Sequence, residues 1–296
     1  MSAAEIKAGK QQDMAKKHSQ WGDVMRRLIK NPLAVIGVIL IVLLVLSAIL
    51  APVLTPYDEA TQDMYNRFQM PNAQHLMGTD NYGRDLFTRI LYGGRTSLLV
   101  AVLALIFSVI VAIVLGAVAG YFGGWIEMVI MRATDIIQSV PPILFAVVVS
   151  AALGGGIWQT AVAVGISGVA PNIRLIRGQI LVSRGQEYVE AAIATGAGNA
   201  RVMFRQLLPN VVSPLIVSAS MGIGGNITAI SSLSFIGLGV QPPISEWGQI
   251  MTSGREYILQ FWPLSIFPGI MIMLTLFAFN CAGDGLRDAM DPRLRK

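Results

Sequence analysis

Uncharged and charged stretches alternate along the chain, and this pattern predicts its main elements. A helix needs about 20 apolar residues to cross the hydrocarbon core of a membrane, and several stretches without Asp, Glu, Lys or Arg reach that length. One of them, residues 136–173, is too long for one crossing, and a glycine triplet at 154–156 marks a break within it. The pattern therefore predicts six spans, at about 33–54, 97–120, 129–152, 157–173, 210–236 and 263–282.

The basic residues between the spans predict the orientation. With the N-terminus inside, all but five of the 22 Lys and Arg residues fall in inner segments. Cytoplasmic loops of membrane proteins are enriched in these residues, so we expect both termini and the segment around Glu190 in the cytoplasm. The five on the outer side are Arg67, Arg84, Arg89, Arg95 and Arg255.

These predictions divide the chain into four parts. They are a cytoplasmic N-terminal segment (1–30), a first span with an external segment (31–95), a five-helix core (96–284) with a cytoplasmic loop at 185–209, and a cytoplasmic tail (285–296). The long external segment is expected to fold over the outer mouth of a pore. Because the first thirty residues lack an apolar core, we expect no cleaved signal peptide.

Composition supports a membrane protein and excludes several other classes. Apolar residues make up 54% of the chain and charged residues 13%, with a mean hydropathy of +0.60, whereas soluble domains carry about 25% charged residues. Lipid must therefore cover much of the surface. The net charge of +5 lies mainly in inner segments, so we expect membrane lipid and no nucleic acid as a partner. A single Cys281 with two histidines, His18 and His75, predicts no internal disulfide and no metal cluster.

The inner segment at 185–208 is polar and flanked by arginines, between very apolar stretches. Its spacing predicts two short helices around a break at Gly196 and Gly198, with Glu187 near the N-terminus of the first helix and Pro209 ending the second. One interpretation is an amphipathic hairpin on the membrane surface. The other is a surface that a cytoplasmic partner binds.

A family resemblance favours the second interpretation. Glu190-Ala191-Ala192, followed by Gly196 and Leu208-Pro209, resembles the loop that permease subunits of ATP-driven (ABC) importers present to their ATPase partners. Gln206 departs from the general pattern, which has an apolar residue there. By this resemblance the coupling residues are Glu187, Tyr188, Glu190, Ala191, Ala192, Gly196, Ala197 and Pro209.

Motifs elsewhere point to one branch of that family. The segment His75–Asp80, with Gly83-Arg84-Asp85 and Tyr92–Arg95 after it, resembles the C-type permease of dipeptide, oligopeptide and nickel importers. Further similarities occur at Ser234–Gly239, Gln241-Pro242-Pro243, Trp247-Gly248, Gly283–Asp288 and Asp291-Pro292. The resemblance therefore covers nearly the whole chain.

The resemblance implies an all-α integral membrane protein of six transmembrane helices with the type I ABC importer permease fold. It implies a non-catalytic subunit in the cytoplasmic (inner) membrane that pairs with a related B-type permease, two ATPases and an external solute-binding protein. ATP and Mg²⁺ would bind the ATPases, since this chain lacks a phosphate-binding Gly-Lys-Ser/Thr loop. The expected solute is a di- or oligopeptide, with nickel or a glutathione-like solute as the alternative.

Several residues within or beside the spans are candidates for a solute path or gate, each with a structural alternative. Arg132 and Asp135 are three residues apart and form either a gate or a structural ion pair. Pro141 and Pro142 should interrupt span three, as a kink or as a mobile gate. In span five, Asn226 and Ser231 either line the path or belong to tight helix packing.

The charged residues of the external segment leave two interpretations open. Asp80, Arg84, Asp85 and Arg89 predict either an internal salt-bridged scaffold or a docking face for a binding protein. His75 lacks companion ligands, so we expect an ordinary surface residue.

Two other functional classes lack the residues that they require. A secondary transporter needs coupling carboxylates in mid-membrane, and the middles of the predicted spans contain none. A membrane enzyme needs a cluster of catalytic side chains, and no predicted span holds a histidine.

Overall fold

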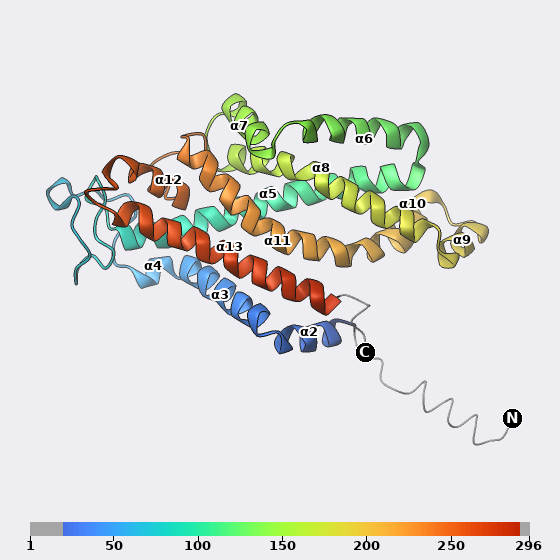
Figure 1. Ribbon diagram of the computed structural model, residues 1–296, viewed down its shortest axis with the longest axis horizontal. Coiled ribbons are helices and arrows are strands. Elements are labelled where there is room, and N and C mark those ends of the chain that lie inside the picture. Colours follow the sequence, from blue (N-terminus) through green and yellow to red (C-terminus); the bar gives the residue numbers. More distant parts are fainter. Residues whose placement is uncertain (1–19, 291–296) are drawn as a thin grey trace, which may run out of the picture.

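The computed structural model describes residues 20–290, and every regular element in that range is a helix (Figure 1). The predictions for residues 1–19 and 291–296 lie outside the described range. The long helices run roughly parallel along the longest axis of the molecule (Figure 1). They are α3 (Pro32–Ile49), α5 (Leu86–Phe122), α8 (Ile157–Arg184), α11 (Leu208–Phe235) and α13 (Pro263–Met290).

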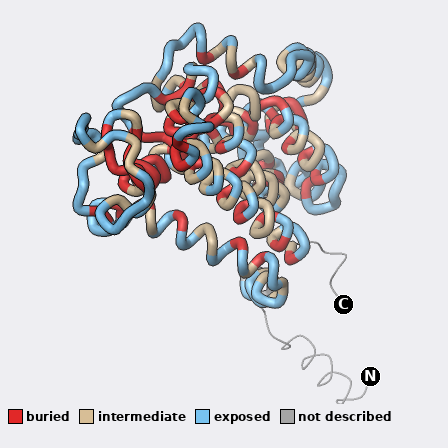
Figure 2. Tube along the Cα trace, turned by 60° about the vertical axis from the view of Figure 1, so that its left-hand side comes forward, coloured by how far each residue is buried: buried red, intermediate tan, exposed pale blue. Residues whose placement is uncertain are grey.

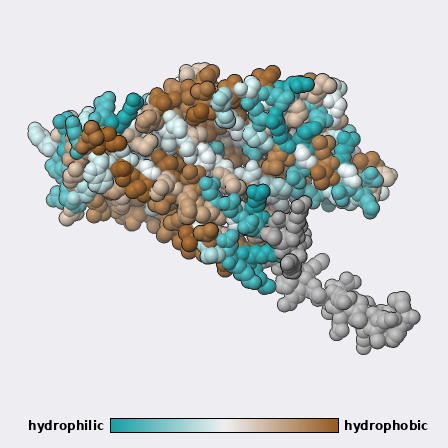
Figure 3. All heavy atoms as spheres, in the orientation of Figure 1, coloured by the Kyte–Doolittle hydropathy of each residue, from teal (hydrophilic) through white to brown (hydrophobic). Residues whose placement is uncertain are grey.

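Shorter helices join and cap the long ones. They are α2 (Gln20–Lys30), α4 (Ala51–Leu54), α6 (Gly124–Ser139), α7 (Pro142–Leu153), α9 (Glu187–Ala194), α10 (Asn199–Arg201) and α12 (Trp247–Ser253). The 3₁₀ turns η1 (Met64–Asn66) and η3 (Arg255–Tyr257) and the π-helical turn η2 (Val202–Leu207) complete the set. Figure 3 shows hydrophobic atoms along the middle of the visible face and hydrophilic atoms at both its ends, as expected where a membrane surrounds the middle.

Four helical stretches among the described residues are long and apolar enough to cross a membrane: α3, α5, α13 and the continuous run 199–235. The pair α6 and α7 adds a fifth if it counts as one broken span. The remaining predicted span corresponds to α8, which is 28 residues long but less apolar, because Gln159, Asn172 and Arg174 interrupt it. Helices therefore occupy the predicted positions, although the third is divided between α6 and α7. Four or five of the six predicted spans have the length and apolarity of a crossing, and α8 does not.

The pair Pro141-Pro142 breaks the chain sharply, as the sequence predicts. Helix α6 ends at Ser139, α7 begins at Pro142, and the two are bent by 92°. Proline lacks an N–H donor and forces the preceding residue out of the helical region. Val140 accordingly has an extended backbone, with ψ of 133°.

Helix α5 is longer than predicted, because it begins at Leu86 instead of about Ser97. Asp85 caps its N-terminus and accepts a hydrogen bond from the Thr88 amide at 2.7 Å. Arg89 lies inside the helix with no exposed surface. The start of the uncharged run therefore does not mark the start of this helix. Arg89 is tolerated inside the helix because protein groups, and not lipid, surround it.

An internal ion cluster holds the external segment to the helices. Asp80 accepts hydrogen bonds from Arg84 Nε at 2.7 Å and from Arg89 Nη1 at 2.6 Å, and all three side chains are buried. Arg89 also donates to Gln249 of α12 at 2.9 Å. Of the two interpretations left open by the sequence, the structure supports the internal scaffold.

Two further contacts stabilise the external cap, the region formed by residues 55–95 and α12. Glu246 has no exposed surface, caps α12 and accepts a hydrogen bond from Ser97 of α5 at 2.9 Å. His75 is not the ordinary surface residue expected: its Nδ1 lies 2.9 Å from Asp85 Oδ2, and 13% of its side chain is exposed. Figure 2 shows buried residues gathered both in this region and on the inward sides of the long helices.

Helices α5 and α8 pack against each other through a row of small residues. Ala104, Ser108, Ala112, Gly116 and Gly120 recur every four residues along α5, and all are buried. A Cβ atom on Gly116 or Gly120 would come within 3.0 Å of side-chain carbons of Ile176 or Ile180 on α8. Such rows allow helix backbones to approach closely in lipid, where packing and not the hydrophobic effect drives association.

We predict that Arg89→Gln destabilises the protein strongly. Removing one member of a buried ion pair costs about 3–5 kcal/mol, because the remaining charge stays buried. The midpoint of thermal unfolding in detergent should fall by roughly 5–15 °C. Arg95→Gln is the matched control, since Arg95 is exposed on the same helix. Equal midpoints for both variants would contradict the internal scaffold.

Candidate functional site

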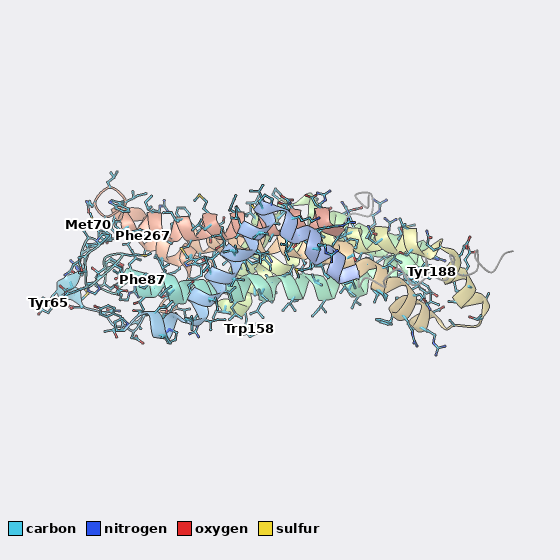
Figure 4. The ribbon with its side chains drawn as sticks, turned by 90° about the horizontal axis from the view of Figure 1, so that it is seen from below. Tyr65, Met70, Phe87, Trp158, Tyr188 and Phe267 are labelled. Atoms are coloured by element: carbon cyan, nitrogen blue, oxygen red, sulfur yellow. The ribbon has the colours of Figure 1, made fainter. Side chains whose placement is uncertain are left out.

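The predicted loop forms a projecting hairpin at one end of the molecule. Figure 4 shows Tyr188 at the end of the long axis opposite Tyr65 and Met70 of the external segment. Helix α9 begins at Glu187, as predicted, and two residues separate it from the end of α8. The loop and the external cap therefore lie on opposite sides of the apolar middle.

One side chain anchors α9 to the helical core. Val189 has no exposed surface and packs in a cluster with Val202, Leu207 and Val211. Burial of such a side chain contributes about 1.5–3 kcal/mol. Two polar contacts add to it: Tyr188 Oη accepts a hydrogen bond from Asn210 at 2.7 Å, and Tyr121 of α5 donates one to Asn199 at 2.8 Å. The loop is therefore attached to α5 and α11 as well as to α8.

Gly196 closes α9 in a conformation that other residues adopt at a cost. Its φ is +82°, and its amide donates to the Ile193 carbonyl at 2.9 Å. The Ala197 amide donates to the Ala192 carbonyl at 3.0 Å. This pair of bonds is the Schellman motif, in which a glycine in the left-handed region ends a helix. A Cβ atom on Gly196 would meet nothing within 4 Å. Within this chain, glycine is therefore favoured by the positive φ and not by a lack of space for a side chain.

The prediction that Pro209 ends the second short helix is wrong. Residues 199–235 form one continuous run in which α10 leads into η2 and η2 into α11. The Leu208 amide donates to the Met203 carbonyl, five residues back. This wider π-helical turn precedes Pro209, which occupies the first turn of α11, a position where proline's missing N–H does no harm.

The remaining loop residues are presented outward. Glu187, Tyr188, Glu190, Ala191, Gly196 and Pro209 are exposed, and Ala192 and Ala197 are half-buried. Two large apolar side chains are exposed beside them, Ile193 at 50% and Phe204 at 63%. The loop combines carboxylates, small residues and apolar side chains on one projecting surface, which is the composition of a protein-binding surface.

Ion pairs fasten α6 to α8 near this end of the molecule. Arg132 lies 3.7 Å from Asp135, which confirms the predicted pairing, and Asp135 also accepts a hydrogen bond from Arg174 of α8 at 2.5 Å. Arg177 Nε donates to Glu127 at 2.6 Å. The contacts with Arg174 and Arg177 were not predicted. The pairs with Arg174 and Arg177 link α6 to α8, and a role as a gate stays a prediction.

The two candidates in α11 make packing contacts. The Asn226 amide donates to the Ala101 carbonyl of α5 at 3.1 Å. Ser231 is buried, and a Cβ atom on Gly248 of α12 would meet its backbone. These positions suit the helix-packing alternative, and a path-lining role for them stays a prediction.

A groove with a volume of about 890 Å³ lies between α8, α11 and α13. Its polar lining comes from all three helices and consists of Asn172, Gln179, Asn210, Ser213, Ser218 and Arg287. Pro171 borders both this groove and a smaller cavity of about 240 Å³ beside Pro142, at the break between α6 and α7. The predicted break thus lies next to the groove.

Sequence reasoning missed most of the groove, although a signal was present. Asn172 and Gln179 are seven residues apart, so they share one face of α8. Asn172 donates to Ser108 of α5 at 3.0 Å and accepts from Ser218 of α11 at 3.3 Å. A polar stripe of this kind faces protein or water and not lipid.

The family is shown by comparison with known proteins. Residues 112–296 match the model of the binding-protein-dependent transport system inner membrane component, and residues 19–71 match the N-terminal transmembrane domain of oligopeptide transport permease C. The chain belongs to this family of transport permeases. It is therefore a multi-pass, non-catalytic subunit of the inner membrane, and its family implies ATPase and solute-binding partners.

Relatives of this permease cover almost its whole length. The dipeptide transport system permease protein DppC of Alkalihalophilus pseudofirmus is 42% identical over 94% of this chain and 91% of its own. The glutathione transport system permease protein GsiD of Pectobacterium atrosepticum is 40% identical over 93% and 92%. The oligopeptide transport system permease protein OppC of Bacillus subtilis is 36% identical over 99% and 96%.

A solved structure shares the permease fold. A chain of the MetNI methionine ABC transporter, in an inward-facing conformation, matches with a TM-score of 0.55 at 15% identity. The match covers 69% of this permease and 97% of that chain. At this identity the likeness shows the fold alone, and it confirms the expected type I importer architecture.

We predict that Gly196→Ala loosens the end of α9. An L-residue in the left-handed region costs about 1–2 kcal/mol, so amide hydrogen exchange at residues 196 and 197 should accelerate about 5- to 30-fold. Gly185→Ala is the control, because Gly185 ends α8 with an ordinary φ of −82° and equally open surroundings. Unchanged exchange in the Gly196 variant would show that the Schellman motif is not maintained in the membrane.

Proposed function

We propose that this permease is the C-type subunit of an ATP-driven importer of di- and oligopeptides, paired with a related B-type subunit. The observation that carries the proposal is 42% identity to a dipeptide permease along 94% of the chain, together with a match to the N-terminal domain of oligopeptide permease C. The chain itself holds no cofactor, and ATP and Mg²⁺ bind the partner ATPases. An external binding protein delivers the solute.

The exposed loop is the part that the ATPases move. Glu187, Glu190, Ala191 and Gly196 face outward on a hairpin that Val189 fixes to the core. A force on α9 passes directly into α8 through the two-residue link, and through the small-residue interface into α5. Closure of the ATPases on ATP thereby changes the arrangement of the helices around the solute path.

The arrangement of the chain ends supports a cytoplasmic loop. Helix α2 packs against the end of α13, and both lie toward the end of the molecule that carries α9 (Figure 1). This geometry fits an even number of crossings with both termini on the loop side. Cytoplasmic loops are enriched in Lys and Arg, and the basic residues on this side support a cytoplasmic location for it.

The groove between α8, α11 and α13 is this subunit's half of the solute path. Its amides and hydroxyls offer hydrogen bonds to a peptide backbone, and no carboxylate among its lining residues would hold a peptide's amino group. Conduction requires contacts weak enough for the solute to leave. The B-type subunit closes the open side of the groove.

A glutathione-like solute is the second candidate, because a glutathione permease is 40% identical over 93% of the chain. Glutathione is itself a peptide, so the same groove chemistry serves both. Uptake assays with dipeptides, longer peptides, glutathione and nickel, each with the matching binding protein, distinguish the candidates.

Gly196→Asp should abolish uptake while the protein remains in the membrane at normal abundance. The substitution adds the left-handed strain and a charged side chain to the surface that meets the ATPases, so ATP hydrolysis should continue without transport. Radiolabelled peptide uptake and ATPase activity of the reconstituted complex measure the two steps. Wild-type uptake by a normally expressed variant would contradict the proposal, and Gly185→Ala should transport normally.

Ser213→Cys tests the path in a Cys281→Ser background. Ser213 lines the groove, whereas the neighbouring Val212 is 42% exposed on α11 but is not among the lining residues. A negatively charged methanethiosulfonate reagent should block uptake at least tenfold in the Ser213→Cys complex and leave the Val212→Cys complex unaffected. Equal inhibition, or none, would place the solute path elsewhere.

A further inference from the structure

Helix α2 carries two different exposed stripes side by side. Met25 and Ile29, 57% and 64% exposed, form an apolar stripe. Arg26 and Lys30, also exposed, form a basic stripe. Members of each stripe are four residues apart and the stripes are one residue apart in sequence, so they occupy neighbouring faces of the helix. The half-buried Leu28 lies on another face.

The position of α2 is fixed by its junction with α3. Asn31 interrupts the helix, and its side chain accepts hydrogen bonds from the amides of Leu33 at 3.1 Å and Ala34 at 3.3 Å. Ala34 is fully buried against Gly285 of α13, where a Cβ atom would clash with it. The bend between α2 and α3 is therefore stabilised by specific contacts, and it is visible in the blue ribbon of Figure 4.

The apolar stripe leads into the lipid-facing surface of the first span. Leu33 and Ile36 on α3 are 58% and 46% exposed and follow Ile29 within two turns. Figure 1 shows α2 beside the end of α13, while α9 projects further along the long axis. Hydrophilic atoms cover α2 directly beside hydrophobic atoms over α3 (Figure 3). Helix α2 thus lies at the level where the apolar middle of the protein ends.

We propose that α2 is an interfacial helix that binds anionic phospholipid headgroups of the cytoplasmic leaflet. Met25 and Ile29 enter the boundary of the acyl chains, and Arg26 and Lys30 contact the phosphates. The half-buried Arg27 lies beside this pair on the helix. Only the choice of leaflet rests on the proposed orientation.

Lipid fits this surface better than an acidic protein. An acidic protein could bind the two exposed basic side chains alone. It would not explain why an apolar stripe lies beside them and continues into a membrane span. A membrane interface supplies both environments within one helix diameter. Basic residues at an anionic membrane surface contribute about 1 kcal/mol each, which corresponds to about fivefold in affinity per residue.

A fluorophore at position 22 tests the proposal in the assembled complex. Gly22 is exposed on α2, and a Cβ atom there meets nothing within 4 Å. The complex carrying Gly22→Cys and Cys281→Ser is labelled with an environment-sensitive NBD group. It is then reconstituted in phosphatidylcholine vesicles with 0 to 40% phosphatidylglycerol in both leaflets, so that the result does not depend on orientation or on transport.

The expected result is a blue shift of NBD emission that grows with the phosphatidylglycerol fraction. At about 1 M salt the screening length falls to roughly 3 Å, so the shift should reverse. Arg26→Gln with Lys30→Gln should raise the lipid fraction needed for half the shift at least fivefold. Arg255→Gln, which changes an exposed arginine in η3, should leave it unchanged.

Three outcomes would overturn the inference. The first is the same emission in both lipids at every salt concentration. The second is a full response in the double variant. The third is a blue shift that depends on the ATPase subunits and not on phosphatidylglycerol, which would identify a protein as the occupant.

Discussion

The row of small residues on α5 is the constraint on which the rest of the structure depends. Lipid provides little hydrophobic drive for helices to associate, so close backbone contact has to supply the stability. Gly116 and Gly120 let α8 approach until Ile176 and Ile180 occupy the space that side chains would fill. Because α8 leads into the exposed loop, this contact fixes where the loop projects. Under the proposed function, a displacement of the loop would move α5 and α8 together.

Charge is handled differently at the two ends of the permease. At the end that carries residues 55–95, Asp80 and Arg89 are buried together, so this segment is bound to α5 and α12. At the end that carries the loop, the ion pairs of Asp135 and Glu127 are partly exposed, and exposed pairs contribute little stability. The end with residues 55–95 is thus held by buried ion pairs, while the ion pairs at the loop end can rearrange at little cost, as the proposed function requires.

Much of this architecture is readable from the sequence, for identifiable reasons. Uncharged runs locate the spans because lipid excludes charge, and Pro141-Pro142 marks a break because proline lacks a donor. The exposed loop is recognisable because its pattern of Glu190, Gly196 and Leu208-Pro209 is local in sequence. Gly196 illustrates this best, since its positive φ follows from the helix end that it closes.

The failures share a physical cause, which is that tertiary contacts override local rules. Arg89 sits inside a helix because Asp80 and Gln249 surround it, so the charge pattern places the start of α5 too late. Pro209 does not end the helical run, because it lies in the first turn of α11 directly after a π-helical turn. The groove is formed by three helices far apart in sequence. Asn172 and Ser213 can therefore be recognised as lining residues only once α8 and α11 are seen side by side. Asn226, polar but bonded to a backbone carbonyl, shows that polarity alone does not identify a path.

The central claim is that this chain works as one subunit of a larger importer whose ATPases move the exposed loop. The most direct measurement is purification of the tagged permease from its own membrane in mild detergent, with mass spectrometry of every protein that stays bound. Our account predicts recovery of a related second permease and of ATPase subunits. Repeated recovery of this chain alone, in several detergents, would contradict it and would return the loop to a hairpin on the membrane surface.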